Sequence, residues 1–345
     1  YKNEIDFRDR VHFPSDATVA LPELHGTSTP HLDPLVPLGG GKDSVVTGEL
    51  LKKASIPFTL FSTSQAQPVV QTAKLLDAPI LFAERRLDPQ LFELNTKPGV
   101  YNGHVPITGY LYFVALLVAI LHKKTDVVWS LESSAEEATV DYLGMKINHQ
   151  FSKTLRFERA FQQYCKTFVT KNVRSFSLLR PFSELQIVKQ FVQFPEYFSH
   201  FGSCNRNFTQ KKPARHEGTF WCGACAKCAF IFVSLCAFLP HNDVVNIFAN
   251  DLFASETLLP TLKELLGLQE HKPFDCVGTI EETRAAMELA MHRGDARDTR
   301  WMQTYVAEVR DTVKDHDALI HKALTPSKEH AIPQEYQPVL EHMNA

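Results

Sequence analysis

Four cysteines of this chain have the type and spacing of metal ligands. Cys222, Cys225 and Cys228 form a C-x₂-C-x₂-C pattern, and Cys204 precedes them in the sequence. Four thiolates satisfy a tetrahedral Zn²⁺ ion, and short C-x₂-C spacings allow one turn of chain to supply two ligands. We therefore predict a structural zinc site at these four residues. An iron–sulfur cluster, which uses the same ligands, and reduced thiols without a metal are the alternatives.

A glycine-rich loop ahead of a predicted helix is the second candidate site. Its residues are Gly39, Gly40, Gly41, Lys42, Asp43 and Ser44. Glycines let backbone N–H groups approach an anion closely, and a helix N-terminus adds unsatisfied donors and a partial positive charge. Lys42 supplies a mobile cation, Asp43 can cap the helix or hold Mg²⁺, and the Ser44 hydroxyl can donate to a phosphate oxygen. The loop therefore predicts a nucleotide phosphate site in which Lys42 and Asp43 act in catalysis.

Two widespread phosphate motifs do not match this loop. A Walker A loop requires Ser or Thr directly after the lysine, where Asp43 stands, and the dinucleotide fingerprint requires a glycine where Ser44 stands. The loop instead resembles the PP-loop, S-G-G-x-D-S, of ATP pyrophosphatase-type enzymes, with Gly39 in place of the first serine. That resemblance implies cleavage of ATP between its α and β phosphates. It also implies that Mg²⁺ neutralises the pyrophosphate and that Ser62, at the end of the second predicted strand, lies near the adenosine.

The elements that must position these residues alternate between strands and helices. Apolar runs predict strands at 35–38, 56–62, 79–84 and 126–131, and helices at 43–54, 69–76 and 110–122. Strands that alternate with helices at this spacing indicate βαβ units and a parallel sheet covered on both faces. We expect an α/β fold with a doubly wound parallel sheet of the PP-loop type, whose ligands bind at the carboxyl ends of the strands.

Changes in pattern along the chain divide it into four expected parts. Residues 1–34 form an N-terminal arm or the remnant of a missing region, 35–195 a PP-loop ATP-binding domain, 196–240 a four-cysteine metal-binding subdomain, and 241–345 a mainly helical C-terminal region. The chain opens at Tyr1 without a Met, which we also interpret as a sign of missing upstream residues.

The composition excludes several classes of protein. With 345 residues, of which 44% are hydrophobic and 22% charged, the chain can bury a core, so disorder is excluded as its main state. A formal net charge of −3 argues against a nucleic-acid partner, which favours a basic excess. The longest apolar run, 110–121, is too short to span a bilayer. We therefore predict a buried helix there, no membrane contact and a cytoplasmic location.

Several segments of the sequence resemble those of one enzyme family. They are the segments 1–7, 38–44, 132–137, 147–153, 179–185, the cysteine run and 272–278. Together they are similar to the UDP-N-acetylmuramoyl-L-alanyl-L-glutamate epimerase (MurL) family over roughly residues 1–285. Members of that family have an additional N-terminal region, which agrees with a chain that starts within its fold. The glycine loop followed by C-G-x-C-x-x-C also resembles 7-cyano-7-deazaguanine synthase, a shorter enzyme that activates a carboxylate with ATP.

The MurL resemblance implies an ATP- and Mg²⁺-dependent inversion of the terminal L-Glu of UDP-MurNAc-L-Ala-L-Glu to D-Glu, in peptidoglycan precursor biosynthesis. Adenylation of the carboxylate, with release of pyrophosphate, would come first, because an α-proton beside a free carboxylate is very weakly acidic. A base then removes that proton, an acid returns one to the opposite face, and water releases AMP. The alternatives are a PP-loop carboxylate- or carbonyl-activating enzyme that acts on a nucleobase or tRNA, and a zinc-stabilised nucleotide sensor without turnover.

Four residues are candidates for the proton transfer: Glu132, His149, Lys153 and Cys276. Glu132 follows a predicted strand at its carboxyl end, where active-site groups gather, so we favour it as a Mg²⁺ or substrate contact. His149 can titrate near neutrality. Lys153 would share a helical face with His149 if that stretch is helical, and it could equally bind a phosphate of the UDP moiety. Asn148 and Arg180 are candidate contacts to an anionic substrate, for which a guanidinium is well suited. A lone histidine more often has a structural role, so the sequence leaves the two proton-transfer groups open.

Two further segments are weaker candidates. The residues Arg206, Lys211, Lys212 and Arg215 form a basic loop beside the cysteines, which is either a solvated surface or a contact to the substrate diphosphate. His104 lies just before the predicted helix 110–122, where a ligand-binding role and a helix-capping role are equally compatible with the sequence.

Overall fold

A five-stranded parallel sheet forms the centre of the protein. The structure is a computed structural model that describes residues 3–14, 23–26, 31–101, 105–204 and 219–343. The strands are β1 (Pro34–Pro37), β2 (Thr59–Ser62), β3 (Ile80–Phe82), β4 (Asp126–Trp129) and β7 (Arg174–Ser177). Their order across the sheet is β3-β2-β1-β4-β7, and every neighbouring pair is parallel. The predicted α/β fold with a parallel sheet is confirmed.

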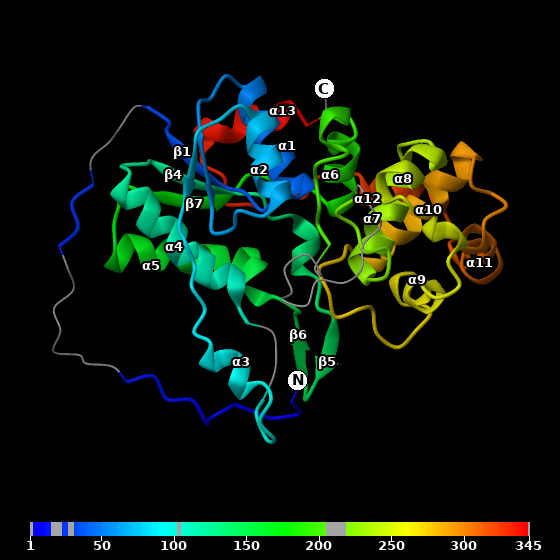
Figure 1. The fold of residues 1–345 in the computed structure, drawn as a ribbon, viewed down its shortest axis with the longest axis horizontal. Helices are drawn as coiled ribbons and strands as arrows, with labels where there is room; N and C mark the ends of the chain where they lie inside the picture. The colour runs from blue at the N-terminus through cyan, green and yellow to red at the C-terminus, as the bar shows by residue number, and fades with distance from the viewer. Residues whose placement is uncertain (1–2, 15–22, 27–30, 102–104, 205–218, 344–345) are drawn as a thin grey trace.

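Helices cover both faces of this sheet. The helices α1 (Lys42–Lys53) and α2 (Gln67–Leu76) lie on one face, and α4 (Ile107–Leu121) and α5 (Leu155–Phe168) lie on the other (Figure 1). Because successive side chains of a strand point to opposite faces, the strands contribute to two separate cores. Leu35, Phe61 and Val127 pack with the α4 and α5 side, whereas Val36, Leu60 and Val128 pack with the larger core on the other side.

The apolar helix α4 is only half buried. Tyr112, Ala115 and Ala119 are buried against the sheet, but Leu117 and Leu121 on the outer face are 56% and 69% exposed. The prediction of a buried helix is therefore wrong for this outer face, because a run that is apolar on all sides carries no sign of which side meets the sheet. Within the described ranges, no helix has both the length and the apolar character needed to cross a membrane.

Several elements before α6 are absent from the sequence predictions, among them the short helix α3 (Gln90–Leu94), the strand β7 and a hairpin. The strand β7 is short and polar, and none of the predicted strands includes it. A hairpin joins β5 (Val140–Tyr142) to β6 (Met145–Ile147) through Leu143 and Gly144, whose φ angles are +50° and +73°. Two consecutive positive φ angles are the geometry of a tight two-residue hairpin turn.

The described residues after β7 are mainly helical, as predicted for the C-terminal region. Their helices are α6 (Glu184–Phe191), α7 (Ala226–Cys236), α8 (His241–Phe248), α9 (Leu259–Leu265), α10 (Ile280–Arg293), α11 (Arg300–Glu308), α12 (His316–Ala323) and α13 (Gln337–Glu341). Most of them gather beside the sheet around the buried helix α7, and α13 returns to pack against α1 (Figure 1). The sheet and the helical part therefore share one continuous core on the α1 side.

Candidate functional site

The candidate site lies at the carboxyl edge of the sheet, where the chain order changes direction. From β1 the chain passes through α1 to β2 on one side, and β4 lies beside β1 on the other. Open α/β sheets bind ligands at such a switch point, outside the carboxyl ends of the strands. The glycine loop follows the end of β1, and Glu132 follows the end of β4, so these two predicted site segments meet at one edge of the sheet.

The glycine loop has a backbone that larger residues would disturb. Gly40 has a φ of +78°, and a Cβ atom there would lie 2.8 Å from the backbone of Pro68 and Val69. A Cβ atom on Gly41 would lie 2.7 Å from the Ser203 hydroxyl oxygen. The helix α1 begins directly after Gly41, and no side chain of the described residues caps it. The first N–H groups of α1 therefore remain available to an anion.

The Lys42 side chain is fully buried within a network of charges. Its ammonium pairs with the carboxylates of Asp43 and Glu184, and Lys227 donates to the other oxygen of Glu184 over 2.7 Å. Burial alone would raise the pKa of Glu184, but Lys227 and Lys42 outweigh it and lower that pKa to about 2. The carboxylate thus stays ionised between two lysines. Ser44 donates to the carbonyl of Gly41 over 3.0 Å.

Ser62 lies where the sequence places it, at the end of β2. It is buried, and its hydroxyl oxygen accepts from the backbone N–H of Ser64 over 3.2 Å. Since β2 pairs directly with β1, Ser62 and the glycine loop lie at the carboxyl ends of neighbouring strands.

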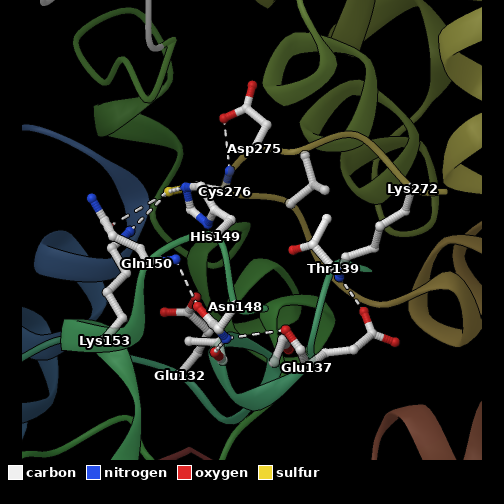
Figure 2. A pocket seen from close by; sticks show the side chains of 13 residues that line it. Glu132, Glu137, Thr139, Asn148, His149, Gln150, Lys153, Lys272, Asp275 and Cys276 are labelled. Carbon is white, nitrogen blue, oxygen red and sulfur yellow. Dashed lines mark hydrogen bonds and ion pairs between the residues drawn. The ribbon is translucent and has the colours of Figure 1, made fainter. Parts of the chain in front are cut away.

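One pocket brings together all four candidates for proton transfer. It is lined by Glu132, Ser134, Ala135, Glu137, Thr139, Asn148, His149, Gln150, Lys153, Lys272, Asp275, Cys276 and Val277. These residues come from three segments that are distant in the sequence: the turn after β4, the loop between β6 and α5, and the loop before α10 (Figure 2). The convergence of these segments depends on the fold and could not be deduced from local spacing.

The Cys276 thiol has two close polar partners in this pocket. Lys153, at the end of the 3₁₀ helix Phe151–Lys153, donates from Nζ to the sulfur over 3.0 Å. The Nε2 atom of His149 lies 3.3 Å from the same sulfur (Figure 2). His149, Asp275 and Cys276 also have ligand atoms within 4.8 Å of one another. The Lys153 ammonium nevertheless places a positive charge where a metal ion would have to bind, so we do not interpret this group as a metal site.

The pocket shifts the pKa values of its ionisable side chains in different directions. Burial, together with the carboxylates of Glu184 and Asp43, raises the pKa of Glu132 to about 7. Burial and the Lys153 ammonium lower the pKa of His149 to about 4. Burial opposes the charge on Lys153, but Cys276 and Glu132 outweigh it and raise the Lys153 pKa. At neutral pH the pocket therefore holds an uncharged imidazole, a charged lysine and a carboxyl group near its midpoint.

The structure gives the two predicted substrate contacts partners within the protein. Asn148 lines the pocket, and its amide nitrogen donates to the carbonyls of Ala135 and Glu137 over 2.7 and 3.1 Å. Arg180 is 1% exposed, and it donates to the Glu158 carboxylate and to the backbone carbonyl of Glu132 over 3.0 and 2.8 Å. Both side chains hold the pocket walls in place, and a contact of either to substrate stays a prediction.

The four predicted metal ligands lie together. The sulfur of Cys225 is 3.4 Å from that of Cys228 and 3.9 Å from that of Cys204, and Cys222 lies 3.7 Å from Cys228. A tetrahedral Zn²⁺ ion with Zn–S bonds of about 2.3 Å requires sulfur atoms about 3.8 Å apart. All seven cysteines are free thiols. The sulfur positions therefore fit a four-thiolate metal site, and of the other three cysteines, Cys165 and Cys236 are buried while Cys276 lines the pocket.

Some residues of the site carry no clear signal in the sequence. Lys227 lies between the clustered cysteines near the start of α7, and Glu184 is the first residue of α6. The only sign of a functional role in the sequence is a charged residue near the start of each of these largely apolar helices. Lys272 pairs with Glu137 across the pocket wall, again between distant segments. The basic residues Arg206, Lys211, Lys212 and Arg215, and also His104, lie outside the described residues.

Several known proteins are similar to this chain. A solved structure of a U34-tRNA thiolase from Methanococcus maripaludis with its [4Fe-4S] cluster is 14% identical, with a TM-score of 0.35 over 54% of this chain and 61% of that chain. The UDP-N-acetyl-alpha-D-muramoyl-L-alanyl-L-glutamate epimerase of Xanthomonas oryzae pv. oryzae is 35% identical over 96% of this chain and 73% of that protein. The protein of the same name from Micromonospora sp. is 36% identical over 93% of this chain and 70% of that protein.

Family models cover most of the chain. The MurL N-terminal domain matches residues 1–178, and the MurL C-terminal domain matches residues 200–320. The first match includes the glycine loop and Glu132, and the second includes all four clustered cysteines and also Cys276. The chain therefore belongs to the MurL family of epimerases.

Proposed function

We propose that this protein inverts the terminal L-Glu of UDP-MurNAc-L-Ala-L-Glu to D-Glu in peptidoglycan precursor biosynthesis, which we assign to the cytoplasm. One observation carries the proposal. The glycine loop and the pocket that contains the proton-transfer candidates lie at the same edge of the sheet, and Glu184 connects them, because it pairs with Lys42 of the loop and its N–H donates to Ser134 of the pocket over 3.0 Å. Activation of a carboxylate and removal of the neighbouring proton can then occur on one bound substrate.

Activation precedes proton transfer for an electrostatic reason. Removal of an α-proton beside a carboxylate would place a second negative charge next to the first. In the proposed first step, a carboxylate oxygen of the glutamate attacks the α-phosphate of ATP, a C–O–P linkage forms, and pyrophosphate leaves. The resulting acyl-adenylate is neutral at the acyl group and can delocalise an enolate. After inversion, water adds to the acyl carbon and AMP leaves with the bridging oxygen.

The glycine loop provides the phosphate-binding part of this proposal. Its two crowded glycines, Gly40 and Gly41, hold the backbone close to the start of α1, whose first N–H groups can donate to phosphate oxygens. Lys42 would move from its carboxylate partners to the phosphates, and Gly39 and Ser44 would complete the loop. The carboxylate of Asp43 can contribute to binding Mg²⁺, which would neutralise pyrophosphate charge. Ser62 on the neighbouring strand would lie near the adenosine.

The pocket provides the proton-transfer part. Glu132, His149, Lys153 and Cys276 are the groups that can hold or move a proton, and Asn148 and Arg180 fix the walls from which they project. The four clustered thiols fit Zn²⁺, which when bound would cross-link the segment at Cys204 to the start of α7. That assignment is structural and gives the metal no part in the reaction.

One incubation tests the proposal. The protein is supplied with ATP, Mg²⁺ and UDP-MurNAc-L-Ala-L-Glu in D₂O, and AMP, the configuration of the glutamate and deuterium at its α-carbon are measured. We expect AMP together with D-Glu that carries α-deuterium. AMP that forms only with a nucleobase acid or tRNA would support the alternative activating enzyme. Absence of AMP with every substrate would contradict both enzymatic assignments.

A further inference from the structure

The Lys153 ammonium contacts one acidic group of the pocket and is influenced by the charge of a second. It contacts the Cys276 sulfur at 3.0 Å, and both Cys276 and Glu132 favour its charged form. Glu132 also faces Asp43 and Glu184, whose carboxylates oppose its ionisation, and Lys42, which favours it. The charge of one lysine therefore interacts with two acidic groups of the pocket.

Two groups that can each carry a negative charge, Cys276 and Glu132, therefore line the same pocket as the Lys153 ammonium. If both groups were ionised, two anions would share one ammonium in a buried pocket already bordered by Glu184 and Asp43. If both were protonated, the buried ammonium would have no anion beside it. A thiolate with a protonated carboxyl, or a thiol with a carboxylate, leaves one anion beside Lys153. Such complementary states are what an epimerase needs, because one face of the α-carbon requires a base while the other requires an acid.

The two acids project from different walls of the pocket. Glu132 comes from the turn after β4, where Arg180 holds its backbone carbonyl over 2.8 Å. Cys276 comes from the loop before α10, where its own N–H donates to the Asp275 carboxylate over 2.7 Å. In Figure 2 the labelled Glu132 and Cys276 come from different segments that line the pocket, and Lys153 reaches toward Cys276. A planar enolate held between these walls would offer one face to each group.

We propose that Cys276 and Glu132 are the two proton-transfer groups, that they act on opposite faces of the α-carbon, and that Lys153 stabilises whichever of them is ionised. This inference rests on the proposed epimerase function. Because Lys153 contacts Cys276 in this structure, the thiolate takes the α-proton of the L-epimer. The electron pair of the C–H bond passes into the enolate, and the Glu132 carboxyl then gives its proton to the opposite face. The cycle leaves a thiol and a carboxylate, and exchange of protons with solvent restores the first state.

His149 has a positioning role in this scheme. Its ring nitrogen lies 3.3 Å from the Cys276 sulfur, and burial beside Lys153 keeps the ring uncharged at neutral pH. An uncharged imidazole can orient the sulfur without adding a second cation to the pocket.

The test follows the α-hydrogen of the L-epimer in single-residue variants. The substrate carries deuterium at its glutamate α-carbon, and the reaction runs in ordinary water with ATP and Mg²⁺. We expect C276A and C276S to form AMP but to retain the deuterium, with wash-out reduced by at least about 100-fold. E132Q should form AMP and lose the deuterium, yet return the L-epimer with hydrogen in its place. C165A and E281Q, which change a buried cysteine on α5 and a surface glutamate on α10, should behave as the unmodified protein does.

Several outcomes would overturn the assignment. One is loss of deuterium by both Cys276 variants at the rate of the unmodified protein. Another is formation of D-Glu by E132Q at the rate of the unmodified protein. A third is loss of AMP formation in correctly folded variants of either residue. The last result would assign the residue to carboxylate activation. If the unmodified protein itself forms no AMP and no D-Glu, the proposed function fails, and that failure is distinct from the failure of this inference.

Discussion

The backbone N–H of Gly202 donates a hydrogen bond of 2.9 Å to the carbonyl oxygen of Gly40. This bond ties the segment that ends in Cys204 to the glycine loop. A second connection runs from Lys227, between Cys225 and Cys228, through the Glu184 carboxylate to Lys42. The cysteine cluster is therefore attached to the candidate phosphate site on two sides.

Removal of the metal should accordingly weaken nucleotide binding. We expect C225A to lose its zinc and to bind ATP at least about tenfold more weakly, equivalent to about 1.4 kcal/mol. Elemental analysis gives the zinc content, and calorimetric titration gives the ATP affinity. The control is C236A, which changes a buried cysteine outside the cluster and should keep both properties. Unchanged ATP affinity in zinc-free C225A would show that the two sites are independent.

Two effects of a side chain at Gly40 can be separated: the contact of its Cβ atom with neighbouring backbone, and the strain of a positive φ angle. Gly40 and Gly99 share a φ of +78°, but only at Gly40 would a Cβ atom meet neighbouring backbone, at 2.8 Å. G99A should therefore cost only about 1 kcal/mol of stability from backbone strain, with AMP formation unchanged. G40A should carry the same strain and also displace the loop from α2, with loss of AMP formation. AMP release and thermal unfolding of the two variants make the comparison, and equal AMP formation in both would rule out a steric role for Gly40.

The buried pair of Lys227 and Glu184 should contribute strongly to stability. Substitution of one partner in a buried ion pair leaves an uncompensated charge, which costs about 3 kcal/mol or more. We expect K227M to lower the free energy of unfolding by that order, although Lys42 still contacts Glu184. The surface pair of Lys322 and Glu281, whose side chains are 69% and 54% exposed, provides the control. K322M should cost less than about 1 kcal/mol, and chemical denaturation measures both variants. Similar losses in the free energy of unfolding of K227M and K322M would contradict a stabilising role of the buried network.

Sequence patterns predicted those parts of the site that are contiguous in the chain. The glycine loop, its helix and the C-x₂-C run are local signals, since a strand, a tight turn or a ligand spacing is encoded within a few residues. The strand β7 escaped prediction because Arg174–Ser177 has little apolar character of its own and gains its pairing from β4.

Pairings between distant segments could not be predicted in the same way. The contacts of Lys227 with Glu184 and of Lys153 with Cys276 join residues brought together only by the folded sheet and helices. The sequence named Lys153 and Cys276 as candidates, but their contact, and the side of the pocket on which each lies, required the structure.

Glu132 should make stability depend on pH with a definite sign. Its pKa in the folded protein is about 7, above the ordinary value of 4.5, so the folded state holds the proton more tightly than the unfolded state. The protonated side chain therefore contributes stability that is fully present below pH 4.5 and is lost as the pH rises through 7. The difference between these pKa values corresponds to a loss on the order of 3 kcal/mol.

The variant E132Q, whose side chain is neutral at every pH, tests this dependence. Relative to the unmodified protein, it should have a similar unfolding temperature at pH 5 and a higher one at pH 8.5. The matched carboxylate is Glu184, whose pKa is lowered to about 2 by its lysines against the effect of burial. E184Q should therefore be destabilised at both pH values, because its lysines lose an ionised partner. If E132Q gave no relative gain at pH 8.5, Glu132 would have to be ionised in the folded protein without cost, and it could not be the acid that protonates the enolate.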